Sequence, residues 1–367
     1  MLFGVILSAA MFSPSTVLAR PEGVVVYGGF AFAGNAGDIA SSYPYSLLVD
    51  RKGGSGASLF ETRLSSFFHA NAHSIPGITI SFDTVRKGEP SCVLALALTN
   101  EKVLKETLGD IHKLVVQLDF ELLTLDFEGM QIVSSAPICL ELVDDQKSEF
   151  SESDIADRIF GMIDGDQSQL IVALVSKIGR IRAESRNVCT LQVSSVMIGD
   201  KALPFMPASL RGRTDTYGQT VAQLFGSLLS AQAGVALLPH VKDGLNSKMS
   251  LRFADATALQ FKIPSPTFAV SLDLKGFKKI LKERTDAETL WIYGAFLGVK
   301  VYEPEFKTVY LDTTAKFGVP KIVPASQAAY DEFPVVSDAL KGAVLNAIEA
   351  MQRDPTTKTK VLNRCQL

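Results

Sequence analysis

The chain has 367 residues, of which 47% are hydrophobic and 20% are charged. This is the composition of a folded globular protein, which excludes an intrinsically disordered chain, and the length suggests about two domains. Lys and Arg total 36 and Asp and Glu total 39, for a formal charge of -3. No net positive field therefore favours nucleic acid or an anionic membrane, and no nucleic-acid partner is predicted.

The first nineteen residues differ from the rest of the chain. An apolar run spans residues 1–12, Ser13, Pro14 and Ser15 interrupt it, and residues 17–19 read Val-Leu-Ala. This order predicts a secretory signal peptide over residues 1–19. The run is too short to cross a bilayer, so no transmembrane segment is predicted. No Lys or Arg precedes it, which keeps open a buried amino-terminal strand or helix.

Four cysteines stand far apart, at Cys92, Cys139, Cys189 and Cys365. Their spacing fits neither a disulfide framework nor a zinc site. Cys92 and Cys139 lie in apolar stretches typical of buried thiols. One structural disulfide is compatible with an exported protein, and its pairing stays open.

A glycine- and aromatic-rich stretch over residues 27–38 follows a predicted opening strand at residues 24–27. If Phe30 and Phe32 are exposed, they form a contact patch for a ligand or partner. If they are buried, they fill the core.

A second glycine-rich segment covers residues 52–58 and leads into a predicted helix at residues 59–69. Backbone amides at a helix start attract anions, so Gly53, Gly54, Ser55 and Gly56 are candidate ligand-binding residues. The segment lacks the complete pattern of a phosphate-binding loop, a dinucleotide site or a hydrolase nucleophile elbow. A flexible loop is the competing interpretation, and no cofactor is predicted.

Two histidines at the end of the same helix, His69 and His73, are spaced four residues apart. This spacing can place two imidazoles on one face for a metal ion. No Glu stands beside His69, however, and residues 74–77 end the helix. A helix-end pair is favoured, and no metal site is predicted.

A long apolar hairpin is predicted over residues 114–143, with its turn at Glu128 and Gly129. Apolar and polar residues alternate with period two, which predicts strands with one solvated face and a bulge near residues 122–123. The polar positions include an acidic row, Asp119, Glu121, Asp126 and Glu128. Such a row can perform acid–base work or bind divalent ions, but we expect a charged outer face.

A similar hairpin recurs over residues 290–319, with its turn at residues 303–305. Before the hairpins lie predicted strands at 93–98 and 268–272, followed by predicted helical stretches at 103–106 and 280–283. Helices with amino-terminal caps are predicted afterwards at 151–163 and 337–351. The repeated order indicates an internal duplication.

The predicted fold class is therefore α/β (α+β), with two similar tandem domains at residues 20–180 and 181–367. Each domain is expected to contain a mixed sheet, a long antiparallel hairpin and packing helices. The boundary is expected at residues 179–187, with an amphipathic helix at 170–181 packed across it.

The order of elements in each half, ending in a hairpin such as that of residues 290–319, resembles the amino-terminal domain of TolB and the related CsgG-like envelope proteins. The resemblance covers most of each half and rests on architecture. It implies an envelope protein that acts through contacts and not through catalysis.

Three functions follow as hypotheses. The first is an exported, periplasmic or envelope-associated interaction or assembly protein that binds a protein partner or itself. The second is a small-molecule binding protein that uses a cleft between the halves. The third is a hydrolase using Ser55 with a distant histidine such as His240.

Overall fold

The computed structural model describes residues 23–34, 37–51, 57–72, 78–83, 92–108, 110–165, 167–178, 189–241, 247–327 and 330–366. The predicted fold class is confirmed, because the chain forms a mixed sheet of long strands with packing helices. The segment predicted as a signal peptide lies outside the described residues.

The first half builds a five-stranded sheet. Its elements are β1 (Gly23–Ala33), α1 (Ile39–Ser42), α2 (Pro44–Arg51), α3 (Leu59–Asn71), β2 (Ile78–Ser81), β3 (Cys92–Leu108), β4 (Ile111–Asp126), β5 (Gln131–Gln146), α4 (Glu152–Ile163) and α5 (Gln169–Ile178). Strand β1 pairs in parallel with β2 and β3, and β3, β4 and β5 form an antiparallel meander.

The second half repeats this order of pairings. Its elements are β6 (Leu191–Lys201), a 3-10 turn (Leu203–Phe205), α6 (Ala208–Arg211), α7 (Thr214–Ala233), β7 (Leu237–Leu238), β8 (Lys248–Phe253), β9 (Ala258–Lys262), β10 (Phe268–Arg284), β11 (Glu288–Glu303), β12 (Thr308–Pro324), α8 (Phe333–Arg353), α9 (Pro355–Thr357) and a π-helical turn (Lys358–Leu362). Strand β6 pairs in parallel with β7 and β10, and β10, β11 and β12 form the meander.

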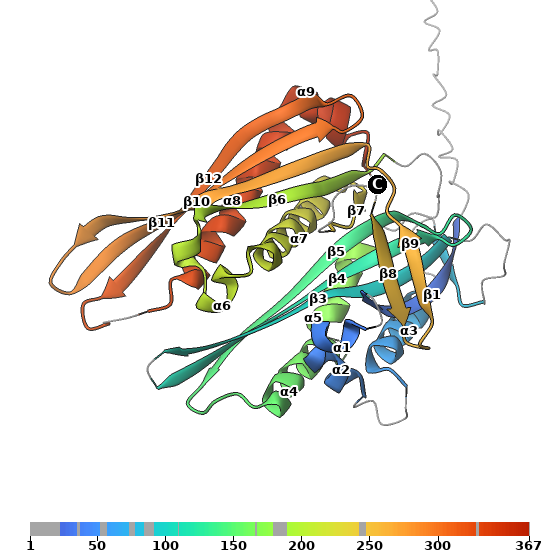
Figure 1. Ribbon diagram of the computed structural model, residues 1–367, viewed down its shortest axis with the longest axis horizontal. Coiled ribbons are helices and arrows are strands. Elements are labelled where there is room, and N and C mark those ends of the chain that lie inside the picture. Colours follow the sequence, from blue (N-terminus) through green and yellow to red (C-terminus); the bar gives the residue numbers. More distant parts are fainter. Residues whose placement is uncertain are drawn as a thin grey trace, which may run out of the picture.

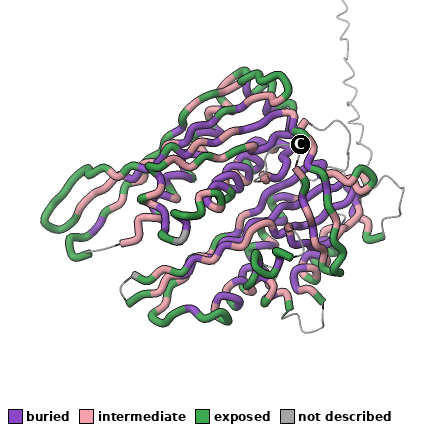
Figure 2. Tube along the Cα trace, viewed as in Figure 1, coloured by how far each residue is buried: buried purple, intermediate pink, exposed green. Residues whose placement is uncertain are grey.

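The two sheets and the helices are stacked as layers (Figure 1). Helix α7 lies between the two sheets, α8 packs beside it on β11 and β12, and α1 to α5 lie on the opposite side of the first sheet. One core cluster fills the space between the second sheet and α7 and α8, and another lies between the first sheet and its helices. Figure 2 shows the buried residues concentrated in these strands and in α7 and α8.

Two features connect the halves. The short strand β7 pairs with β6 and also with β5, through Leu237 and Ser135, so the two sheets become one. The β8–β9 hairpin of the second half pairs with β1 at the far edge of the first sheet. A third apolar cluster lies where this hairpin meets β1, β3 and β4.

A disulfide joins Cys189 and Cys365, which are 176 residues apart. It holds the segment before β6 next to the carboxyl end, and the Ala236 amide donates to the Cys365 carbonyl at 2.7 Å. Cys92 and Cys139 are outside this disulfide and lie in strands, as expected.

The predicted helical stretches at residues 103–106 and 280–283 are wrong. Both belong to 17-residue strands, β3 and β10, which continue along β4 and β11. Leu, Lys and Glu favour a helix locally, but pairing with a neighbouring strand overrides that preference. Each half therefore contains a three-stranded meander in place of a helix followed by a hairpin.

Two finer predictions also need correction. The β4–β5 register shifts between Thr124 and Leu125, not near residues 122–123. The final long helix begins at Phe333 and not at Ser337, because Pro334 in its first turn starts the helix earlier. By contrast, Ser151 caps α4 as predicted, within a capping box completed by Asp154.

Candidate functional site

The glycine-rich loop predicted to bind ligand, with Gly53, Gly54, Ser55 and Gly56, lies outside the described residues, as does His73. Phe30 and Phe32 continue strand β1 and are buried in the core of the first half. Phe30 stacks on Phe60 with 4.5 Å between ring centroids. These two aromatic residues therefore form no exposed contact patch.

His69, at the end of α3, stacks on Phe82 with 3.6 Å between ring centroids. This ring contact accounts for His69 as a packed side chain at the end of the helix. Within the described part of the chain, no group of three or more His, Cys, Asp or Glu side chains could hold a metal ion.

The acidic row on β4 does not form one solvated face. Glu128 is exposed in the turn, and Asp126 accepts hydrogen bonds from the Glu128 and Gly129 amides there. Asp119 and Glu121, however, are only 2% and 3% exposed. The expectation of a charged outer face is wrong for these two residues, because α7 of the second half covers that side of the first sheet.

The sheet register places the polar side chains of this face in rows. Asp119 lies between Asn100 of β3 and Cys139 of β5. The adjacent row, at Gln117, runs from Lys102 to Glu141. Side chains two residues apart on a strand point to the same face, so Gln117, Asp119 and Glu121 all face α7.

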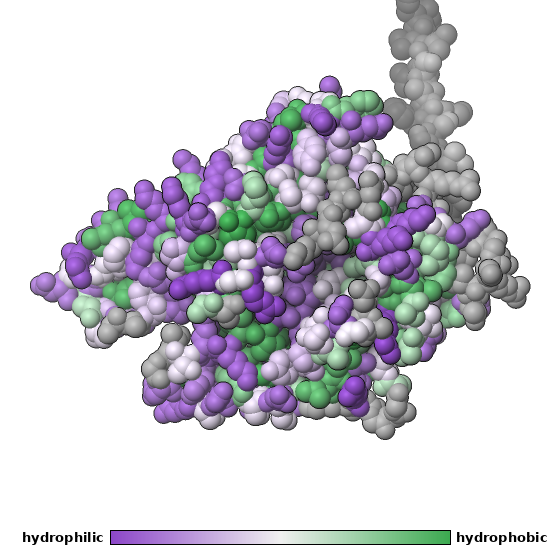
Figure 3. All heavy atoms as spheres, viewed as in Figure 1, coloured by the Kyte–Doolittle hydropathy of each residue, from purple (hydrophilic) through white to green (hydrophobic). Residues whose placement is uncertain are grey.

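A groove lies between this face and the second half, and we call it the α7 groove. Its volume is about 660 Å³. Its polar lining comprises Thr99, Asn100, Asp119, Glu121, Gln219, Gln223, His240, Ser247, Lys248, Ser250 and Gln260. A neighbouring pocket of about 630 Å³ shares Thr99, Asn100 and Gln219 with it and extends past Lys102 to Arg213. In Figure 3, hydrophilic side chains occupy the middle of the side of the molecule that is seen, between the two halves.

Asp119 is held by neutral donors. The Asn100 amide donates to one carboxylate oxygen at 2.9 Å, and the Gln117 amide lies 2.9 and 3.2 Å from the two oxygens. Burial raises the pKa of Asp119, and these hydrogen bonds oppose part of that rise. The floor of the groove therefore holds a fixed acidic group.

Glu121 is less well satisfied. Its Oε2 atom is buried and makes no hydrogen bond, although the Ser135 hydroxyl and the Gln223 side chain lie nearby. Burial raises the pKa of the Glu121 carboxyl from 4.5 to about 8, with Asp119 adding to the rise. The Gln223 amide is directed instead to the Phe120 carbonyl, at 3.1 Å. Glu121 is thus a buried acid with unused hydrogen-bonding capacity at the groove.

His240 lies on the opposite wall, just after β7. Its Nδ1 atom is 2.7 Å from the Val193 carbonyl, so Nδ1 carries the proton and Nε2 is left as an acceptor. Burial lowers the pKa of His240, which favours this neutral form. Sequence reasoning named His240 only as a partner for Ser55, and no local pattern connects it to Asp119 or Glu121.

Lys102 lies at the far end of the same face. It is 8% exposed, and its Nζ atom is 6.0 Å from the ring centroids of Tyr217 and Phe333. Burial lowers the pKa of Lys102, while Asp119 and Glu141 oppose that change. Lys102 therefore lines the neighbouring pocket beside the rings of Tyr217 and Phe333.

No family model matches this chain, and no curated protein matches it. Several solved structures match about half of it. One is described as a neuraminyllactose-binding hemagglutinin homolog from Helicobacter pylori, 11% identical, with a TM-score of 0.29, covering 47% of this chain and 83% of that one. A hypothetical protein from Chlamydia trachomatis is 10% identical, with a TM-score of 0.25, covering 44% and 96%.

A minor lipoprotein from Acinetobacter baumannii is 9% identical, with a TM-score of 0.22, covering 49% of this chain and 97% of that one. All three come from bacteria, and none is described as a TolB or CsgG-like protein. At these TM-scores the likenesses carry no argument about function. Among the described residues, no helix is both long enough and apolar enough to span a membrane.

Proposed function

We propose that this protein is a binding protein that holds a small polar molecule in the α7 groove. The observation that carries the proposal is Glu121, a carboxyl group that is 3% exposed and has an oxygen without a hydrogen-bond partner. Leaving a buried polar group unsatisfied costs about 1–3 kcal/mol. A ligand that reached this oxygen would recover that free energy.

The surroundings of Glu121 support the same proposal. Pockets that bind small molecules combine a volume of about 300–1,000 Å³ with a few fixed polar groups. The α7 groove, at about 660 Å³, offers Asp119, Asn100 and His240 in positions fixed by hydrogen bonds. Strands and one helix from both halves supply these groups, so the groove depends on how the halves pack.

The test is a thermal-shift screen with polar metabolites, followed by calorimetry on each hit. Glu121→Gln keeps the shape of the side chain and should weaken binding of every true groove ligand. Glu128→Gln makes the same change in the exposed turn of the same hairpin and should leave binding unchanged. If no compound in a broad panel of amines, sugars and acids raises the melting temperature, the proposal is contradicted.

A second candidate function is the exported envelope interaction or assembly protein predicted from the sequence. The observation that favours it is β12, the outermost strand of the second sheet, which among the described strands pairs with β11 alone. Val309, Phe317 and Ile322 on this strand are 46%, 42% and 54% exposed. An open strand edge with apolar side chains is a route to pairing with a partner strand.

Light scattering after size-exclusion chromatography, combined with an envelope pull-down, tests this second function. Self-association or capture of a partner should be lost when Val309→Lys places a charge on the edge. A protein that stays monomeric and captures no partner contradicts it.

A further inference from the structure

The ligand of the α7 groove can be assigned a chemical class, an inference that rests on the proposed function. We propose that the groove binds an organic cation, with a primary ammonium or guanidinium group placed between Asp119 and Glu121. This chemistry is shared by free polyamines and by the basic side chains of a peptide.

The first reason is that neither carboxyl group forms a close ion pair within the described residues, because Lys102 acts on Asp119 and Lys177 acts on Glu121 only at longer range. Among the ion pairs within the described residues, none involves Asp119 or Glu121. The hydrogen bonds to Asp119 come from the neutral amides of Asn100 and Gln117. Buried carboxyl groups are ordinarily paired with a cation, because an unpaired buried charge is costly. A cationic ligand would supply that partner to Asp119, and Glu121 would release its proton to solvent as the cation takes its place.

The second reason is the unsatisfied acceptor. Glu121 Oε2 has no hydrogen-bond partner, and neither has the nearby Ser135 hydroxyl. Glu121, Ser135 and His240 together line a small recess that adjoins the groove. An ammonium group has three donors and no acceptor, which suits Glu121 Oε2, a carboxylate oxygen of Asp119 and His240 Nε2.

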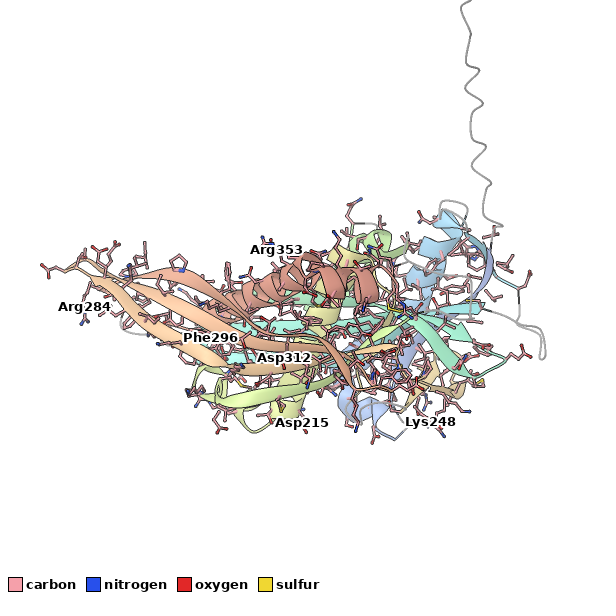
Figure 4. All side chains as sticks on the ribbon, turned by 90° about the horizontal axis from the view of Figure 1, so that it is seen from above. Asp215, Lys248, Arg284, Phe296, Asp312 and Arg353 are labelled. Atoms are coloured by element: carbon pink, nitrogen blue, oxygen red, sulfur yellow. A yellow bond between two sulfur atoms is a disulfide. The ribbon has the colours of Figure 1, made fainter. Side chains whose placement is uncertain are left out.

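The third reason is where the positive charges of the groove lie. Lys248 is exposed on β8 at the rim, and Figure 4 shows it in the half of the molecule away from Arg284. Lys102 is directed to the rings of Tyr217 and Phe333. Burial lowers the pKa of His240, which favours its neutral form. Lys177 of α5 is buried and acts on Glu121, but its ammonium donates to the Ser227 carbonyl of α7 at 3.3 Å. None of these positive groups forms an ion pair with Asp119 or Glu121 within the described residues.

Calorimetric titrations with spermidine and trilysine test the inference, with a neutral trisaccharide, citrate and Ca²⁺ as comparisons. At least one organic cation should bind, and Asp119→Asn and Glu121→Gln should each weaken it by about tenfold or more. Lys248→Gln should strengthen it slightly, and Glu128→Gln should have no effect. Spermidine and trilysine distinguish a free polyamine from a basic peptide.

Circular dichroism and the melting temperature establish that each variant folds. If Asp119→Asn does not fold, Glu121→Gln alone is enough for the test. If the trisaccharide, citrate or Ca²⁺ binds and neither amine binds, the inference of an organic cation is contradicted, but the proposed function still stands. Amine binding that is unchanged in both folded variants would also overturn the inference of an organic cation. If no probe of any kind binds, the proposed function fails as well.

Discussion

At the scale of single residues, Glu121 shows how burial and chemistry oppose each other. The side chain is almost fully buried, yet one oxygen lacks a hydrogen-bond partner. The charged groups around it are Asp119 on the same strand and Lys177 on α5, and His240 stands on the opposite wall. Burial raises the pKa of Glu121 more than Lys177 lowers it, so the carboxyl group keeps its proton up to a pH of about 8.

This protonation predicts a pH-dependent stability. The pKa of Glu121 is raised from 4.5 to about 8 in the folded state, so the folded protein binds the proton more tightly than the unfolded chain. The stabilising contribution is complete below about pH 4.5 and is lost as the pH rises through about 8. Urea unfolding at pH 5 to 8 should show the free energy of unfolding falling by up to about 1 kcal/mol per pH unit.

Glu121→Gln removes this dependence, and at pH 8 it should be more stable than the original protein. The exposed Glu128→Gln should keep the original slope. Equal slopes in all three proteins would mean that Glu121 is ionised throughout this range.

At the scale of elements, the start of a helix depends on which residue caps it. The Ser151 hydroxyl accepts from the Asp154 amide at 3.2 Å, and the Asp154 carboxylate accepts from the Ser151 amide at 2.8 Å. This local pattern suffices to begin α4. The cap predicted at Ser337 lies instead one turn inside α8, because the helix already begins at Phe333.

The two serines make a matched pair for mutation. Ser151→Ala should lower the free energy of unfolding by about 1 kcal/mol, because the Asp154 amide at the start of α4 loses the hydroxyl oxygen that accepts its hydrogen bond. Ser337→Ala should be neutral or slightly stabilising, because alanine is the better residue inside a helix. Equilibrium unfolding in urea measures both. A larger loss at Ser337 than at Ser151 would contradict this assignment of caps.

At the scale of the whole molecule, α7 decides the environment of the first sheet. It contacts β6 of its own half and β5 of the other half. The Lys113 ammonium also pairs with the Asp331 carboxylate just before α8, from the first half to the second. The division into tandem domains at residues 20–180 and 181–367 stays a prediction, although each half has its own core cluster.

The Cys189–Cys365 disulfide closes a span of 176 residues within the second half. Replacing both cysteines with alanine should lower the free energy of unfolding by about 2–4 kcal/mol, because the unfolded chain gains freedom. Guanidinium unfolding with and without reductant measures this loss. Reductant should destabilise the original protein and leave the double variant unchanged. Equal stability of the two oxidised proteins would contradict the contribution of this bond.

The sequence by itself determined features that depend on neighbouring residues. These are the antiparallel strands β4 with β5 and β11 with β12, the turn at Glu128 and Gly129, and the cap of α4. Period-two alternation and capping act over a few residues, so they can be read locally. The same rules recovered the fold class.

Only the tertiary structure decided the features that depend on distant segments. It extended residues 103–106 as strand along β4, joined Cys189 to Cys365, buried Phe30 and Phe32, and covered Asp119 and Glu121 with α7. Alternation shows that the two faces of a strand differ, but not whether water or another layer covers the polar face. That depends on packing between residues far apart in the chain, such as Phe120 and Gln223, which are 103 positions apart.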